Sequence, residues 1–115
     1  MQVHDWKRIG KEQLNPRLAR QVIHSDAMTV ARMHLGEGCL VPEHSHANEQ
    51  ISMVEQGSLL FVIGGVEQVL SAGQFVRIPP NVPHSVESLE DSVAVDVFSP
   101  RREDWIRGDD AYLRK

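Results

Sequence analysis

The chain has 115 residues, with 12 lysines and arginines against 16 aspartates and glutamates, for a formal net charge of −4 at pH 7. This length predicts a single domain over residues 1–115 with one hydrophobic core, and it excludes a modular or repeat protein. The acidic balance offers no basic field to phosphates or anionic lipids, so we expect no nucleic-acid partner and no membrane partner.

The beginning of the chain is polar, and about the first dozen residues are expected to form an arm outside the fold. This start lacks the apolar stretch of a secretory signal, and the single cysteine, Cys39, has no second cysteine for an internal disulfide. The longest apolar run, 59–63, is far shorter than the ~20 residues that cross a bilayer. We therefore expect a cytoplasmic protein.

Apolar and polar residues alternate with a period of two through most of the chain, which indicates β-strands separated by turns. Gly64 and Gly65 mark the clearest hairpin, because both tolerate positive φ between β-rich arms. Many short antiparallel strands in a chain of this length favour an all-β jelly-roll barrel or sandwich, with the barrel core at about residues 25–100. The predicted strands are 17–24, 27–35, 49–55, 59–63, 66–70, 75–78, 84–88 and 92–98.

Only the end of the chain departs from this period. Ser99 is a suitable N-cap, Pro100 fits the first position of a helix, and Gly108 can terminate one. The pattern predicts a short C-terminal helix over residues 100–107.

Two segments contain candidate metal ligands. Alternate residues on a strand share a face, so we expect His44, His46 and Gln50 to point the same way, and a later segment adds His84. Three neutral imidazoles and one oxygen suit a divalent transition metal and leave a position for water or substrate. Each segment alone is equally explained by surface or turn histidines, but the two together match a known pattern.

The two segments resemble the two motifs of the cupin superfamily. The resemblance implies a cupin jelly-roll barrel, also called a double-stranded β-helix. The residues in register with the motifs are Gly38, His44, His46, Gly57, Gly73, Pro79 and His84.

Three positions depart from the cupin motifs. Gln50 replaces a glutamate, Asn81 replaces a glycine, and Ser88 replaces an asparagine. Asn81 can serve at a turn because asparagine tolerates left-handed backbone. Gln50 makes every ligand neutral and leaves the full charge of a cation on the site; the alternative explanation is a cupin that no longer binds metal.

A narrower resemblance joins the run from His44 to Gln50 with the run from Asp96 to Asp104. Together they resemble the single-domain cupins of pectin and alginate degradation, the KdgF-like group, which open and ketonise 4,5-unsaturated monouronates. By position, the resemblance implies metal ligands and catalytic residues. The ligands of a divalent Zn, Ni, Fe or Mn ion would be His44, His46, Gln50 and His84, and the catalytic residues would be Asp96, Phe98 and Arg102.

The pattern of the last predicted strand supports this assignment independently. Asp96 and Phe98 share a face opposite a row of valines, so a carboxylate lies beside an aromatic ring. Arg101 and Arg102 fall at the start of the predicted helix, the wrong end of its dipole for cations, and a bound carboxylate would explain one of them. An ordinary solvated strand face and a charge cluster explain the same residues without any ligand.

These features favour a metal-dependent isomerase that acts on a small unsaturated uronate. A three-histidine metal dioxygenase and a non-catalytic cupin that binds a sugar are the alternatives. We also expect a homodimer, because a small barrel has exposed sheet edges to which the N-terminal arm of a neighbour can add a strand.

Overall fold

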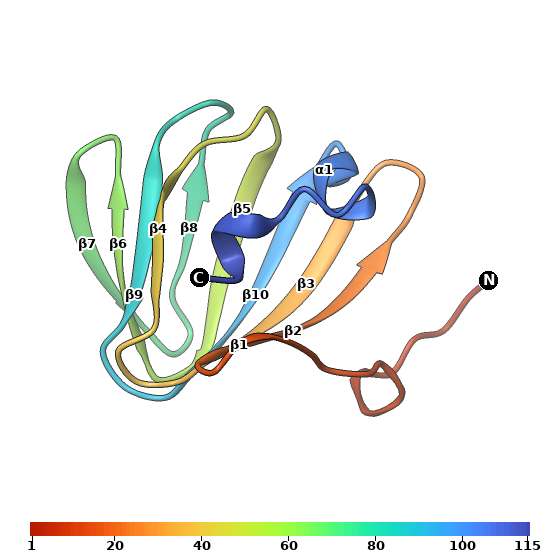
Figure 1. Ribbon diagram of the computed structural model, residues 1–115, viewed down its shortest axis with the longest axis horizontal. Coiled ribbons are helices and arrows are strands. Elements are labelled where there is room, and N and C mark those ends of the chain that lie inside the picture. The colour runs from red at the N-terminus through yellow and green to blue at the C-terminus, as the bar shows by residue number, and fades with distance from the viewer.

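The computed structural model describes residues 1–115, and ten strands make up most of the fold. One short α-helix and two 3-10 helices lie near the ends of the chain (Figure 1). In chain order the elements are η1 (Trp6–Arg8), β1 (Glu12–Asn15), β2 (Leu18–His24), β3 (Thr29–Leu35), β4 (Leu40–His44), β5 (Glu49–Gln56), β6 (Ser58–Ile63), β7 (Val66–Ser71), β8 (Phe75–Ile78), β9 (His84–Ser88), β10 (Ser92–Ser99), α1 (Glu103–Ile106) and η2 (Ala111–Leu113).

The strands form two antiparallel sheets that face each other. The larger sheet has the order β1-β2-β3-β10-β5-β8, and the smaller has the order β4-β9-β6-β7. In Figure 1 the C-terminal segment lies across the open side between these sheets, next to β4. The all-β jelly roll expected from the sequence is confirmed, and no helix is long and apolar enough to cross a membrane.

The period-two pattern places one face of each central strand in the interior. Along β3 buried and partly buried residues alternate without exception. Strand β10 pairs with β3 on one side and β5 on the other, so Asp96 lies between Ala31 and Ser52. Because side chains on one face repeat every second residue, Asp96 and Phe98 point into the interior beside Gln50 and Ser52.

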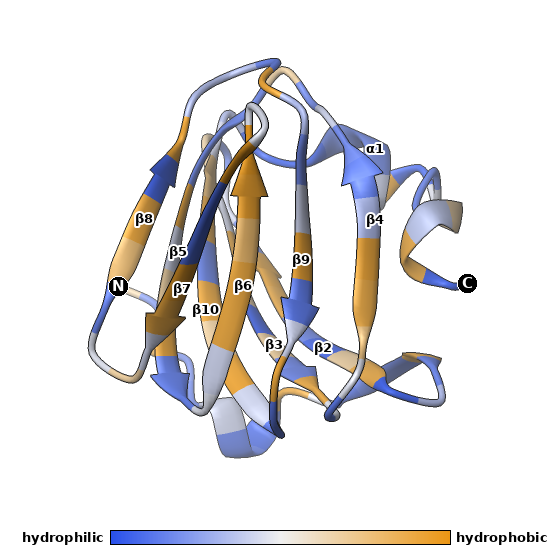
Figure 2. Ribbon diagram, turned by 90° about the vertical axis from the view of Figure 1, so that its left-hand side faces the viewer, coloured by the Kyte–Doolittle hydropathy of each residue, from blue (hydrophilic) through white to orange (hydrophobic).

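Apolar side chains fill the space between the sheets. Phe61 and Leu59 on β6 are each 1% exposed, and they belong to a core cluster of 16 buried residues. Figure 2 shows the long hydrophobic stretches of β4 and β6 that supply this core. Polar residues lie at one end of the same interior, where the candidate site is found.

Two turns require unusual backbone. The hairpin between β6 and β7 has Gly64 and Gly65 at φ values of 55° and 81°, as the sequence predicts. Asn81, which replaces the motif glycine, has φ 64° and is the only non-glycine residue with positive φ. Its amide donates a hydrogen bond to the carbonyl of His46 at 2.8 Å. The asparagine therefore fulfils the role of glycine at a turn that holds a candidate ligand.

The structure corrects three local predictions. Strands β1 and β4 were not predicted: the first is a short polar edge strand, and the second contains Pro42 and shifts register between Val41 and His44. The C-terminal helix is shorter than expected and begins at Glu103, because Ser99 still belongs to β10.

The N-terminal arm is present and lies outside both sheets up to Glu12 (Figure 1). It is attached to β2 through Gln21, whose side-chain amide donates to the carbonyls of Trp6 and Ile9, each at 2.7 Å.

Candidate functional site

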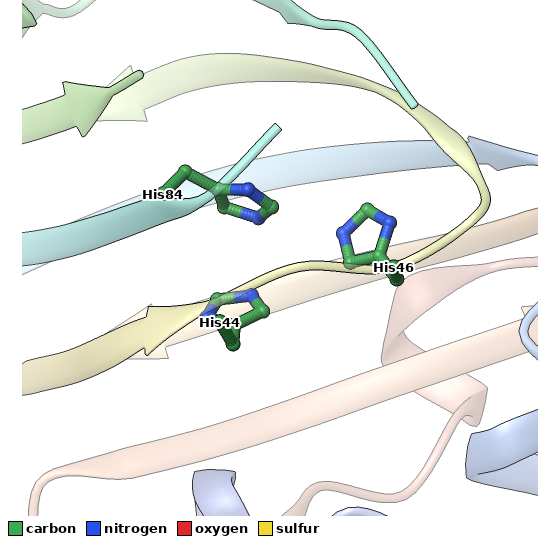
Figure 3. A group of neighbouring side chains, drawn as sticks. All are labelled: His44, His46 and His84. Atoms are coloured by element: carbon green, nitrogen blue, oxygen red, sulfur yellow. The ribbon is translucent and has the colours of Figure 1, made fainter. Parts of the chain in front are cut away.

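Three histidines converge at one end of the interior. His44 ends β4 and is paired with His84 at the start of β9, whereas His46 lies in the loop that leads to β5. Their rings face a common centre in Figure 3, and one ligand atom from each lies within 4.8 Å of the others. The sequence predicted that His44, His46 and Gln50 lie on one strand face; in the structure they instead converge from β4, a loop and β5.

Backbone carbonyls fix the orientation of each ring. The Nδ1 atoms of His44, His46 and His84 lie 2.8, 3.0 and 2.8 Å from the carbonyl oxygens of Pro42, Asn48 and Val82. A carbonyl only accepts hydrogen bonds, so in each neutral ring Nδ1 carries the proton. The Nε2 lone pairs are therefore left for a common ligand.

Two observations show that these lone pairs fit a cation. The Nε2 atom of His84 is buried and has no hydrogen-bond partner. The Nε2 atom of His46 faces Oε1 of Gln50 at 3.0 Å, and both atoms are acceptors. The amide of Gln50 is oriented this way because its Nε2 donates to Oγ of Ser52 at 2.8 Å. A shared cation would satisfy all of these lone pairs.

Burial keeps the rings neutral. It lowers the pKa of His44 and of His46 from 6.5 to about 4, and it also lowers the pKa of His84. Neighbouring rings and Arg102 act in the same direction. A neutral imidazole is the form that binds metal, so the rings need no deprotonation at neutral pH. We call His44, His46 and His84 the histidine wall.

The predicted carboxylate lies in the same cavity. Asp96 and Phe98 line it together with Gln50 and Ser52. Burial raises the pKa of Asp96 from 3.8 to about 6, although hydrogen bonding with Ser52, the charge of Arg102 and hydrogen bonding with Gln50 act to lower it. The structure therefore places a carboxyl group beside the amide whose oxygen faces the histidine wall.

Arg102 also lines the cavity, but its contacts differ from those of a free cation. Its side chain chelates Asp104 through Nε at 3.0 Å and Nη2 at 2.8 Å. The guanidinium carbon lies 4.7 Å from the ring centroid of Phe98 and 4.4 Å from that of Trp105. Asp104 thus supplies, from within the protein, the carboxylate that pairs with Arg102 at the start of the helix.

Two aromatic residues that were not predicted from the sequence complete the cavity, Trp105 and Tyr112. The Tyr112 ring packs 4.5 Å from His44, and its hydroxyl lies 2.8 Å from Nη2 of Arg102. We call Arg102, Trp105 and Tyr112 the C-terminal wall. No spacing in the sequence signals it, whereas Ser52 was detectable, because it follows Gln50 by two residues on a strand.

Comparison with known proteins agrees with this geometry. Residues 31–99 match the cupin domain family. The chain is 35% identical over 98 residues to the pectin degradation protein KdgF of Dickeya dadantii (strain 3937), covering 83% of this chain and 89% of that protein.

Two solved structures share the fold. KdgF from Halomonas sp. has a TM-score of 0.82 at 27% identity, covering 86% of this chain and 93% of that chain. An RmlC-like cupin from Shewanella frigidimarina NCIMB 400 has a TM-score of 0.84 at 27% identity, covering 89% and 93%. The resemblance noted in the motifs is therefore confirmed: the chain belongs to the cupin family, in its group of single-domain KdgF-like cupins.

Proposed function

We propose that the protein is a metal-dependent isomerase that opens and ketonises 4,5-unsaturated monouronates. The observation that carries the proposal is the joining, in one cavity, of neutral histidines, a half-buried carboxyl group and the guanidinium of Arg102. The relatedness to a pectin degradation protein supports a substrate from polyuronide breakdown.

His44, His46, His84 and the amide oxygen of Gln50 would hold a divalent transition metal. Bound there, such an ion supplies Lewis acidity that stabilises negative charge developing on a substrate oxygen. Because all four ligands are neutral, the protein itself does not offset the charge of the ion. The unpartnered Nε2 of His84 is the structural feature that supports this ligand set.

Asp96 is the residue that we propose to move the proton. When the hemiacetal opens, the anomeric hydroxyl loses its proton, the C1–O bond to the ring oxygen breaks, and an enolate forms at C5. A proton added at C4 then gives the C5 ketone, so no proton is gained or lost overall. A carboxyl group held at the cavity wall can accept the first proton and return one at C4.

Phe98 and Arg102 shape the space around such a substrate. Phe98 lines the cavity, where it would offer an apolar contact to a sugar ring. Arg102 places a positive charge beside the cavity, which favours a ligand that carries a carboxylate. Since Asp104 neutralises part of this charge, the site favours one anionic group rather than several.

The test is turnover of an unsaturated monouronate generated in place by a lyase and a glycosidase. Loss of its ultraviolet absorbance and appearance of the open ketone by NMR would be followed with protein loaded with Zn, Ni, Mn or Fe. These uronates also open slowly without a catalyst, so the buffer rate and the Asp96→Asn variant are the controls. No acceleration over buffer with any metal would reject the proposal, and oxygen uptake would point to a dioxygenase.

A further inference from the structure

Tyr112 lines the cavity of the candidate site but has no role in the proposed reaction. Its ring is half-buried on η2 and packs against His44 with an interplanar angle of 31°. The residue lines the same cavity as Asp96 and His84. A ligand that reaches the histidine wall therefore lies beside this tyrosine.

The hydrogen bonds of Tyr112 determine where its own proton is free to point. The hydroxyl oxygen accepts from Nη2 of Arg102 at 2.8 Å and from Nε1 of Trp105 at 3.2 Å. Neither group can accept a hydrogen bond in return. No side chain or carbonyl of the protein accepts from the hydroxyl, so its proton is available to a ligand. Donation from a guanidinium and an indole also polarises the O–H bond and strengthens it as a donor.

Contacts on the far side of η2 hold the tyrosine in place. Asn15 donates from its side-chain amide to the carbonyls of Leu113 at 3.0 Å and Lys115 at 3.1 Å. Asp110 forms ion pairs with the side chains of Arg20 and Arg114. The hydroxyl is thus fixed before any ligand arrives, which reduces the entropic cost of using it.

The neighbouring charge indicates which ligand atom the hydroxyl would meet. Two of the three guanidinium nitrogens of Arg102 are engaged by Asp104 and Tyr112, and the third, Nη1, forms no hydrogen bond within the protein. An acceptor at the Tyr112 hydroxyl is consequently close to a cation. A carboxylate suits this pair of donors better than a neutral hydroxyl does.

We propose that the Tyr112 hydroxyl donates a hydrogen bond to the carboxylate of the bound uronate and, with Arg102, makes the site specific for an acidic sugar. The inference rests on the proposed function, which it deepens by assigning the group that distinguishes uronates from neutral sugars. Tyr112 would be a substrate-contacting residue rather than one that moves a proton.

The first test uses the native sequence, in which Tyr112 is the only tyrosine. Protein labelled with ¹³C at the ζ carbon of tyrosine and loaded with zinc gives one signal for this residue. D-Galacturonate, which lacks the double bond and cannot react, should shift this signal in a saturable way. D-Galactose, its neutral counterpart, should leave the signal unchanged at the same concentration. Equal shifts with both sugars, or none with either, would overturn the proposal.

The second test is Tyr112→Phe, which keeps the ring against His44 and removes only the hydroxyl. Affinity for galacturonate should fall roughly tenfold or more, because a hydrogen bond to a charged group is lost. Zinc content and the weak affinity for galactose should not change. Wild-type affinity for galacturonate in this variant would contradict the proposal.

Asp104→Asn separates direct contact from an effect through Arg102. This variant replaces the carboxylate that binds Arg102 with a neutral amide and leaves the Tyr112 hydroxyl in place. Because Asp104 neutralises part of the Arg102 charge, this variant should keep the preference for galacturonate, whereas Tyr112→Phe should lose it. Equal losses in the two variants would mean that Tyr112 only positions Arg102, and the direct contact would be wrong.

The binding tests and the turnover assay distinguish failure of the Tyr112 inference from failure of the isomerase proposal. If galacturonate binds through Tyr112 but no unsaturated uronate is turned over, the isomerase proposal fails and uronate recognition stands. If turnover is observed but Tyr112→Phe keeps the wild-type KM, the isomerase proposal stands and this inference fails.

Discussion

The two walls of the cavity are held in different ways. Each ring of the histidine wall is oriented by a backbone carbonyl only two residues away. The C-terminal wall depends on side-chain contacts across long sequence distances, such as the pair of Arg20 with Asp110, which are 90 residues apart. The histidine wall is therefore built by local strand and turn geometry, whereas the C-terminal wall exists only when the tail is docked.

This difference predicts that the walls can be disabled one at a time. The histidine wall should control metal content, and the C-terminal wall should control ligand recognition and the stability of the tail. The following experiments test that separation.

The largest effect is expected from His84→Ala. Its ring supplies the unpartnered Nε2 at the centre of the histidine wall. Loss of a direct ligand should weaken metal binding by more than the ~10- to 100-fold that loss of an outer hydrogen bond costs. Elemental analysis and turnover should fall together. His34→Ala, a histidine on the outer face of β3, is the matched control and should keep its metal.

Asp96→Asn should separate proton transfer from metal binding. The substitution keeps the size of the side chain and removes its ability to exchange a proton. Turnover should fall by roughly 10² to 10⁴, the range for loss of a general acid or base. Metal content should equal that of the wild type. Wild-type turnover in this variant would exclude the proposed role of Asp96.

The contrast between a locally fixed wall and a wall held by distant contacts also explains which parts of the site could be predicted from the sequence. The spacing of His44, His46 and His84 was sufficient to predict that the three rings lie together, because turn geometry fixes each ring locally. The strands β8 and β9 have the bounds expected from alternation, whereas β4 was missed because Pro42 interrupts its pattern.

The C-terminal wall could not be predicted in the same way. Trp105 and Tyr112 have no periodic relation to the motifs, and only the packing of the tail against β1, β2 and β4 brings them to the cavity. Similarly, the sequence placed Arg102 near a ligand but could not show that Asp104 binds it.

The third expected effect concerns the anchoring of the tail. Asp110 is 2% exposed and pairs with Arg20, which is 5% exposed, so Asp110→Asn removes the buried partner of this cation and leaves only the exposed carboxylate of Glu12. The free energy of unfolding should fall by about 3 kcal/mol. Hydrogen exchange should increase in residues 100–115, while metal content stays unchanged. Asp109→Asn is the matched control, because its pair with Arg107 is exposed.

Acid should weaken the two walls in different pH ranges in metal-free protein. The folded pKa of His44 and His46 is about 4, below their value of 6.5. Their contribution to stability is therefore complete above pH 6.5 and is lost as the pH falls toward 4. Asp96 opposes part of this loss, because its raised pKa of about 6 favours the folded state when it is protonated.

The C-terminal wall should respond only at lower pH. Hydrogen bonding to Arg114 lowers the pKa of Asp110 below 3.8 and that of Glu12 below 4.5, so their contributions are lost only below those values. Thermal unfolding between pH 7 and 3, combined with hydrogen exchange of the tail, would resolve the two ranges. Loss of tail protection above pH 5 would contradict the assignment.

The smallest effect is expected from Gln50→Glu, which restores the acidic residue of the cupin motif. A carboxylate adds negative charge to a neutral ligand set, so affinity for a divalent ion should rise about tenfold. Turnover should fall at the same time, because the added charge offsets part of the Lewis acidity that the proposed reaction needs. Gln68→Glu makes the same change at an exposed position on β7 and should alter neither quantity. Tighter metal binding with unchanged turnover would mean that the neutrality of the four-ligand set is not what makes the site reactive.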